Sequence, residues 1–270
     1  MNIFVFDIET VPDTASGRRL YQAAELNDED MARVMFQQRR QKTGHEFLAH
    51  HLHRIVAISV CLRCGGQFKV WSLGEPQADE AELIRRFYDG IERFNPAIVS
   101  WNGCGFDLPV LHYRALLHGV AAPRYWEMGD GDASFRYNNY LSRFHWRHID
   151  LMDVLSGYQG RSAARLDEIA LLLGLPGKMG MSGAAVWDSY RAGQIESIRN
   201  YCETDVLNTY LIFLRFELMR GRLNATQYQQ ECELVREALR REDKVHLQAF
   251  LAAWQAADTN LTEPDIHEDA

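Results

Sequence analysis

Short apolar runs rich in strand-forming residues recur along the first 155 residues and predict a β-sheet. The expected strands are residues 2–6, 54–62, 67–73, 97–101 and 148–155, the last of which could also be a passage from strand to helix. Gly65 and Gly66 separate the second and third runs, so these two strands should form a hairpin. The first run, NIFVF, should be buried on both faces of the sheet.

Other segments carry apolar residues at helical spacing. Residues 79–94 repeat apolar side chains along one helix face, and an Asn-Pro pair ends this pattern. Further helices are expected at residues 106–120, 165–174, 188–192, 194–221 and 224–256. The polar residues 13–49 should form an insertion between the first two strands, with a helix that begins near Asn27 or Asp28. A hairpin followed by alternating helices and strands indicates a layered α/β domain.

The composition permits a large core and argues mildly against a high-affinity duplex binder. The chain has 270 residues, of which 47% are hydrophobic, and its net charge is −8. Its isoelectric point is near 5.7, whereas many nucleic-acid binders show a strongly basic footprint. The acidic balance counts less against an enzyme that holds one strand end through metal ions, because bound cations change the local electrostatics.

Cysteine usage and hydropathy indicate the compartment. The five cysteines are odd in number and widely scattered, which gives no disulfide framework and fits a reducing environment. The first residues, MNIFVFDIET, lack the basic start of a signal peptide. No apolar run approaches the roughly 20 residues that span a membrane. We therefore expect a cytoplasmic protein that does not bind a membrane.

Two acids lie close together at the end of the first expected strand. Asp7 and Glu9 are separated by one residue, so on a strand both point to the same face. Two unpaired carboxylates beside an apolar run are costly to desolvate, and a divalent cation with its preference for oxygen ligands would remove that cost. The alternative is a pair of solvated acids at a fraying strand end.

Two further motifs are weak alone. The segment from Asn102 to Asp107 follows a strand and opens a helix, where its aspartate could be an ordinary helix cap. Tyr201 and Asp205 are four residues apart on an expected helix and therefore share one face, roughly 5–6 Å apart. A core tyrosine beside a solvated acid would show the same spacing.

In combination, FDIET, NGCGFD and YCETD resemble the three motifs of the DEDD superfamily of 3′–5′ exonucleases. The four acids of the superfamily match Asp7, Glu9, Asp107 and Asp205, and Tyr201 matches the tyrosine-bearing YxxxD branch. More closely, the chain looks like stand-alone bacterial proteins related to the exonuclease domain of family B DNA polymerases. The segments HRIVAIS, SRFHWRHIDLMDVL, LGLPGK and YCETDVLNTYLIFLRF contribute to this likeness.

The resemblance covers roughly residues 1–225 and implies an α/β RNase H-like fold, with a five-stranded mixed sheet flanked by helices. Residues 226–256 would be a helical extension of the same domain, and residues 257–270 a loose acidic tail. What remains of the chain is too short for a polymerase domain, so any proofreading, in a setting such as DNA repair, would act in trans.

The resemblance also implies a two-metal-ion mechanism with Mg²⁺ or Mn²⁺. One ion would generate hydroxide from water, and the other would stabilise the leaving 3′-oxygen. Asp7 would bridge both ions, Glu9 and Asp205 would hold the ion that carries the nucleophile, and Asp107 would act through the second ion or its waters. Tyr201 would orient the attacking water without binding metal.

Four residues are candidates for substrate contacts. Asn102 and Phe106 would lie beside the active site, where the ring of Phe106 could wedge against the terminal base. Lys178 could contact a phosphate. Arg143 belongs to a segment, residues 136–147, in which arginines alternate with aromatic residues. That composition fits stacking on bases, although the same rings could simply fill the edge of the core.

Two other features have structural explanations. Cys61 and Cys64 form a lone CxxC, which lacks the second ligand pair that a zinc site needs. Asp150 resembles an aspartate that is common after the second motif of the superfamily. We expect it to cap the following helix, with a fifth metal ligand as the alternative.

The leading hypothesis is a 3′–5′ exonuclease that degrades single-stranded DNA from its 3′ end to nucleoside 5′-monophosphates. A 3′–5′ exoribonuclease is the first alternative, because RNA-processing enzymes share these acids and the sequence does not show how a 2′-hydroxyl would be treated. A catalytically silent nucleic-acid-binding module is the second. Such modules usually lack one of the metal-binding acids, and this chain has all four.

Overall fold

A computed structural model of the protein describes residues 2–262. Within this range five strands form one mixed sheet in the order β3-β2-β1-β4-β5. They are β1 (Ile3–Pro12), β2 (His53–Cys64), β3 (Gln67–Ser72), β4 (Ala97–Ser100) and β5 (His148–Asp150). β1, β2 and β3 pair antiparallel, whereas β4 and β5 run parallel to β1. The five-stranded mixed sheet and the hairpin predicted from the sequence are confirmed.

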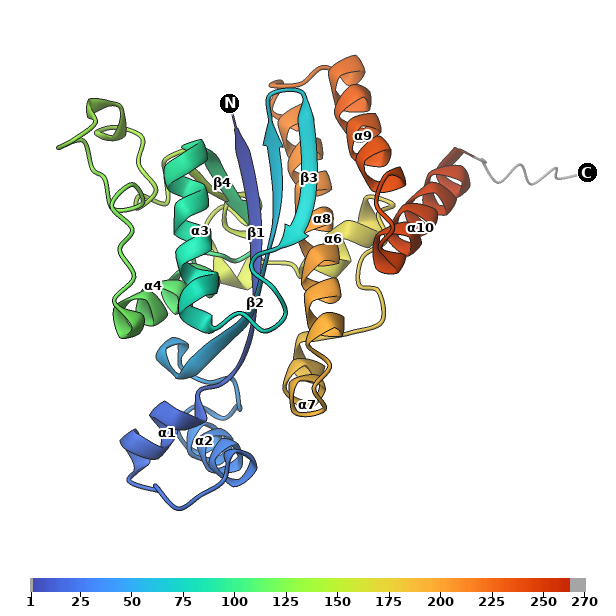
Figure 1. Ribbon diagram of the computed structural model, residues 1–270. Coiled ribbons are helices and arrows are strands. Elements are labelled where there is room, and N and C mark those ends of the chain that lie inside the picture. The colour runs from blue at the N-terminus through green and yellow to red at the C-terminus, as the bar shows by residue number, and fades with distance from the viewer. Residues whose placement is uncertain (1, 263–270) are drawn as a thin grey trace, which may run out of the picture.

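The helices within this range cover both faces of the sheet. They are α1 (Thr14–Tyr21), α2 (Asp28–Thr43), α3 (Glu80–Phe94), α4 (Asp107–His118), α5 (Leu151–Leu155), α6 (Leu166–Leu172), α7 (Val186–Arg191), α8 (Ile195–Met219), α9 (Ala225–Arg240) and α10 (Val245–Thr262). In Figure 1 the sheet separates α3 and α4 from α8, α9 and α10. None of the helices in the described part of the chain combines the length and the apolar character needed to cross a membrane.

Strand alternation distributes β1 between two cores. Phe4 and Phe6 belong to the core under α3 and α4, and the rings of Phe6 and Phe87 lie 4.9 Å apart. Ile3 and Val5 point to the opposite face and join the core formed with α8. β1 is longer than the expected 2–6, because its pairing with β2 continues to Pro12. The two acids of the first motif are therefore inside the strand and not beyond its end.

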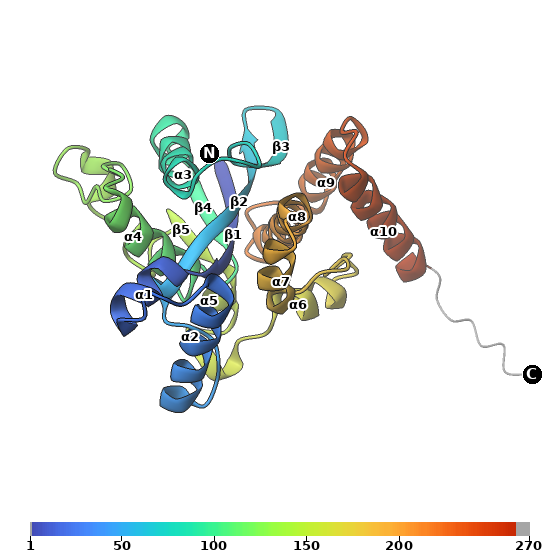
Figure 2. The same cartoon turned by 60° about the horizontal axis from the view of Figure 1, so that its bottom comes forward.

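The insertion between β1 and β2 contains two helices, of which the sequence indicated the second. Asn27 caps α2, as expected, and its side chain accepts a hydrogen bond from the amide of Asp30. Met31 and Met35 on α2 pack with Leu48 and Leu52 into a separate small core. This unit lies beyond one end of the sheet, at the same end as α7 (Figures 1 and 2).

A buried ion network connects the insertion to the body of the domain. Arg114 on α4 is 4% exposed and pairs with Asp13, which caps α1, and with Glu80 on α3. Glu80 also accepts a hydrogen bond from the backbone amide of Ile55 on β2, at 2.7 Å. The network thus fixes the start of the insertion against two helices and a strand.

The C-terminal region differs from the prediction. The expected single helix 224–256 is broken at residues 241–244, so that α10 folds back on α9. Because of this break, Leu247 and Trp254 on α10 join the core that contains Val235 and Leu239 on α9. In a straight helix Leu247 and Trp254 would be left in water. Helix α10 also continues through residues 257–262, where a loose tail was expected; residues 263–270 lie outside the described residues.

β5 and α5 follow the second alternative for residues 148–155, a strand that passes directly into a helix. Asp150 caps α5, as expected, and its carboxylate accepts a hydrogen bond from the amide of Asp153 at 3.3 Å. The same carboxylate accepts bonds from the amides of Asn102 and Cys104, at 2.9 and 2.8 Å. The cap therefore also holds the turn between β4 and α4.

Candidate active site

The acids of β1 point toward α8. Asp7 and Glu9 share the strand face of Ile3 and Val5, which is the face that α8 covers. The thiol of Cys202 on α8 lies 3.4 Å from the backbone oxygen of Asp7 and 3.5 Å from its carboxylate, so it donates to that residue. Strand alternation and the position of α8 together bring the first and third sequence motifs into contact.

The turn before α4 brings in the third acid. Asn102 has a left-handed backbone (φ 65°), and a Cβ on Gly103 would lie 2.2 Å from the hydroxyl of Ser100, so only glycine fits there. Asp107 is the first residue of α4, after Phe106 at the N-cap. Its carboxylate accepts a bond from the amide of Ile8, at 3.2 Å. Asp107 is thus tied to β1 between the two acids and does not cap its own helix.

Helix α8 contributes the side chains of Tyr201 and Asp205 to the site. Both side chains are buried, and the tyrosine hydroxyl lies within hydrogen-bonding reach of the Asp205 carboxylate. The other oxygen of that carboxylate, Oδ1, is buried without a hydrogen-bond partner among residues 2–262. A buried carboxylate oxygen with no protein donor is uncommon in folded proteins and is typical of a position that binds a water or an ion.

Burial and mutual repulsion raise the pKa values of these groups. Burial, followed by repulsion from Asp107, Glu9 and Asp205, raises the pKa of Asp7 well above its usual range. The pKa of Glu9 is raised for similar reasons, although Lys178 opposes the shift. Burial raises the pKa of Asp107 to about 7 and that of Asp205 to about 6. Several carboxylates that are costly to ionise together are typical of a functional site.

Burial and the neighbouring acids also raise the pKa of Tyr201 above its ordinary value, so its hydroxyl stays protonated at neutral pH. A protonated hydroxyl can donate a hydrogen bond to a water or an oxyanion. It cannot serve as an efficient base.

The donor set fits divalent cations. Ligand atoms of Asp7, Glu9 and Cys202 lie within 4.8 Å of one another. The unpartnered oxygen of Asp205 and the carboxylate of Asp107 are further hard oxygen donors, the kind that Mg²⁺ and Mn²⁺ prefer. Cys202 lies inside the third motif, but nothing in the sequence pattern indicated that its thiol would lie beside these acids.

A groove of about 1140 Å³ opens over these acids. Its lining includes Phe36, Phe47 and Leu48 from the insertion, and also Lys178, Ser182 and Trp187. Among the expected substrate residues, Asn102, Phe106 and Lys178 all line the groove. The sequence indicated neither Phe47 nor Trp187, because single aromatic residues in polar segments carry no periodic signal.

Arg143 is not among the described residues that line this groove. Its guanidinium pairs with Asp153 at 2.8 Å and lies 4.9 Å from the ring centroid of Tyr158. In its segment, Tyr140 fills the core edge and donates to the backbone oxygen of Pro96, whereas Phe144 is exposed. The segment thus contains both core and exposed rings, but it lies outside the groove.

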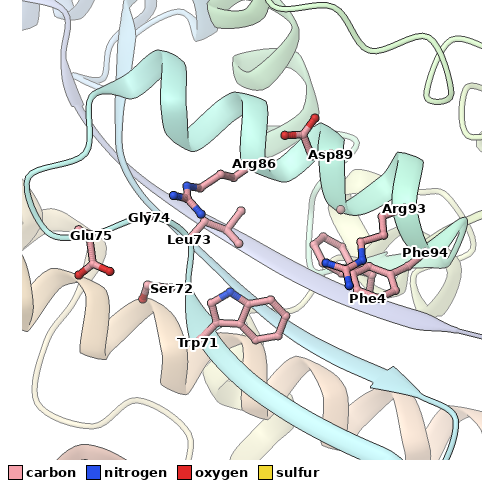
Figure 3. Close-up of a pocket in the computed structure, with 11 residues that line it drawn as sticks. Phe4, Trp71, Ser72, Leu73, Gly74, Glu75, Arg86, Asp89, Arg93 and Phe94 are labelled. Carbon is pink, nitrogen blue, oxygen red and sulfur yellow. The ribbon is translucent and has the colours of Figure 1, made fainter.

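A separate cavity of about 370 Å³ lies between α3 and the β2–β3 hairpin. Figure 3 shows Trp71 on the strand side and Arg86, Asp89 and Arg93 along α3. Its described lining contains none of the acids of the three motifs, and positive and negative side chains alternate in it. The acids thus lie under the larger groove.

Known proteins resemble this chain over much of its length. A family model described as "Predicted 3'-5' exonuclease related to the exonuclease domain of PolB" matches residues 45–254. A stretch of 139 residues, 50% of the chain, is 27% identical to a protein of Archaeoglobus fulgidus named DNA polymerase and covers 17% of it. A stretch of 144 residues, 51% of the chain, is 24% identical to the catalytic polypeptide of DNA polymerase epsilon from Saccharomyces cerevisiae and covers 6% of it.

The chain therefore spans a small part of the length of these curated relatives. The family match contains Asp107, Tyr201 and Asp205, whereas Asp7 and Glu9 precede it and are associated with the site by their geometry. Because the match extends over more than half of the residues, the chain belongs to the family of predicted 3′–5′ exonucleases related to the exonuclease domain of PolB.

Proposed function

We propose that the protein is a metal-dependent 3′–5′ exonuclease that degrades single-stranded DNA to nucleoside 5′-monophosphates. One observation carries the proposal: acids from β1, α4 and α8 come together under a groove of about 1140 Å³. The family supports a nuclease, and the names of the relatives, which are DNA polymerases, favour DNA as the substrate.

Asp7, Glu9, Asp107 and Asp205 would hold two divalent cations, Mg²⁺ or Mn²⁺. When bound, such cations lower the pKa of water and offset the charge of a phosphate. Asp7 is repelled by each of the other three acids, so it is the natural ligand to be shared. Holding cations would also relieve the repulsion that raises the pKa values of these carboxylates.

Tyr201 and Lys178 would act on the substrate side of the site. The protonated hydroxyl of Tyr201 lies beside Asp205 and would orient the attacking water by a hydrogen bond. Lys178 lines the groove, and its positive charge acts on Glu9 and Asp205, which supports the proposal that it attracts a phosphate.

The test is cleavage of a single-stranded DNA oligonucleotide labelled at its 5′ end. The wild type with Mg²⁺ or Mn²⁺ should give a descending ladder, which excess EDTA should abolish. Asp7→Ala should remove nearly all turnover. Asp188→Ala is the control, because that carboxylate on α7 is 81% exposed and does not line the groove.

Three results would contradict the proposal. Full activity after verified metal removal would exclude the metal mechanism. Immediate release of the labelled 5′ nucleotide would indicate the opposite polarity. Faster cleavage of an RNA of the same sequence would replace DNA by RNA as the substrate.

A further inference from the structure

The insertion at residues 13–49 brings an aromatic ring to the groove. Phe47 follows α2, lines the groove over the acids, and is 55% exposed. Its ring centroid lies 5.3 Å from that of Phe106 and 5.3 Å from that of His53. The three rings form one cluster at the edge of the groove, because the rings of His53 and Phe106 also lie 5.0 Å apart.

The backbone that presents Phe47 is fixed. The guanidinium of Arg39 on α2 donates to the backbone oxygen of Phe47 at 2.7 Å. The next residue, Leu48, is 3% exposed and packs with the methionines of α2. His53 hydrogen-bonds through its ring to the hydroxyl of Thr10, at 2.8 Å. The ring of Phe47 is therefore open to solvent, whereas its backbone, the next residue and the neighbouring His53 are held by contacts within the protein.

The insertion also contacts α7, which contributes another aromatic residue to the groove. Arg191 on α7 donates to Glu29 on α2 at 2.5 Å, and Trp187 on the same short helix lines the groove. Figures 1 and 2 show α2 and α7 at the same end of the sheet. The groove over the acids is therefore lined by aromatic residues from both the insertion and α7, and an ion pair connects these two elements.

We propose that the insertion forms a binding wall for an unpaired 3′ strand end, and that Phe47 stacks on one of its bases. This inference rests on the proposed function and adds a residue that determines its substrate class. An exposed aromatic ring in the same groove as a lysine and a cation site fits a nucleotide. The ring would stack on the base, while Lys178 and the cations would bind the phosphate. A base paired within a duplex would not offer its face to this ring.

The test compares Phe47→Ala with the wild type on two single-stranded DNA oligonucleotides. One is intact, and the other carries abasic residues at its 3′ end. On the intact strand Phe47→Ala should raise KM and lower kcat/KM by about 5- to 100-fold, the usual effect of losing one aromatic–base stack. On the abasic strand the two proteins should cleave at similar rates, and Phe47→Trp should stay near the wild type on both.

Leu20→Ala is the matched control. Leu20 belongs to the same insertion, is 59% exposed, and does not line the groove, so kcat/KM should not change. Thermal unfolding of each variant separates a binding defect from a folding defect. An equal loss on intact and abasic strands, or no loss on either, would overturn the stacking role. If the wild type cleaves neither DNA nor RNA, the proposed function fails first, and this inference fails with it.

Discussion

Replacing Asp205 with asparagine should stabilise the metal-free protein at neutral pH and abolish its stabilisation by divalent cations. Burial raises the pKa of Asp205 to about 6, against roughly 3.9 for an aspartate in an unfolded chain. A difference of about two units corresponds to on the order of 3 kcal/mol at pH values above both. Asp205 is only 7% exposed, so solvent screens this cost little.

The direction in which stability changes with pH follows from the protons that each state binds. Below about pH 4 the aspartate is protonated in both states, and it contributes nothing to the difference. Between about pH 4 and pH 6 the unfolded chain loses this proton before the folded protein does, so the free energy of unfolding of metal-free wild type falls as pH rises. Asparagine carries no proton to lose, so Asp205→Asn should lack that part of the slope.

Urea denaturation at pH 5 and pH 8 in EDTA, repeated with Mn²⁺, measures the effect. At pH 8 without metal the variant should be more stable by on the order of 3 kcal/mol, or roughly 6–12 °C in melting temperature. Mn²⁺ should stabilise the wild type much more than the variant, because the variant has lost a ligand. Glu203→Gln is the matched comparison on the same helix and should destabilise the protein under all these conditions.

If Asp205→Asn and the wild type showed the same dependence of stability on pH, Asp205 would have an ordinary pKa, contrary to the expectation. If Mn²⁺ stabilised both proteins by the same amount, the unpartnered oxygen of Asp205 would not bind a cation.

Three further outcomes are expected. Tyr201→Phe should lower the single-turnover rate of cleavage by roughly 10- to 1000-fold with little change in Mn²⁺ affinity by calorimetry, and a wild-type rate would make the tyrosine a packing residue only. Lys178→Met should raise KM for the DNA strand by about 10- to 100-fold, the effect of losing one charge-assisted hydrogen bond. An unchanged KM would show that Lys178 does not contact the phosphate. Arg114→Met should lower the free energy of unfolding by about 3–5 kcal/mol in urea, because it leaves Asp13 and Glu80 buried without their partner, and a loss below about 1 kcal/mol would show that the network is not coupled to folding.

The sequence was sufficient to predict the sheet and α8, because the features that specify them are local. Apolar runs and helical spacing are properties of neighbouring residues, and α8 was expected at 194–221 and observed at Ile195–Met219. The acids of the site could also be proposed from the sequence, because the three motifs in combination resemble those of the DEDD superfamily, although each motif alone has an ordinary structural explanation. The structure adds which faces they share: β1 alternation sends Asp7 and Glu9 toward α8.

Features that depend on distant partners could not be predicted in this way. The break between α9 and α10 follows from the burial of Trp254 against α9, which no local pattern encodes. The position of Phe47 in the groove depends on the packing of α2 against Leu48, which brings together residues more than ten positions apart in the sequence. Arg143 has the composition of a nucleic-acid contact, but its ion pair with Asp153 and its position outside the groove are tertiary properties.

The third motif shows why partners distinguish a structural acid from a candidate ligand. Glu203 and Asp205 are two residues apart on α8, and both are buried. Glu203 is fully paired: although burial raises its pKa, hydrogen bonds from His246, Lys244 and Ser72 lower it to about 2. These bonds also attach α10 and β3 to the helix.

Asp205, in contrast, has one oxygen without any donor among the described residues, and its pKa is raised to about 6. A buried acid that the fold has satisfied holds the structure together, and a cation would add nothing to it. A buried acid that has no protein donor is stabilised when a cation or a proton binds to it. By this criterion we propose that α8 presents Asp205 to the groove as a cation ligand, whereas Glu203 holds the helix in the position that this role requires.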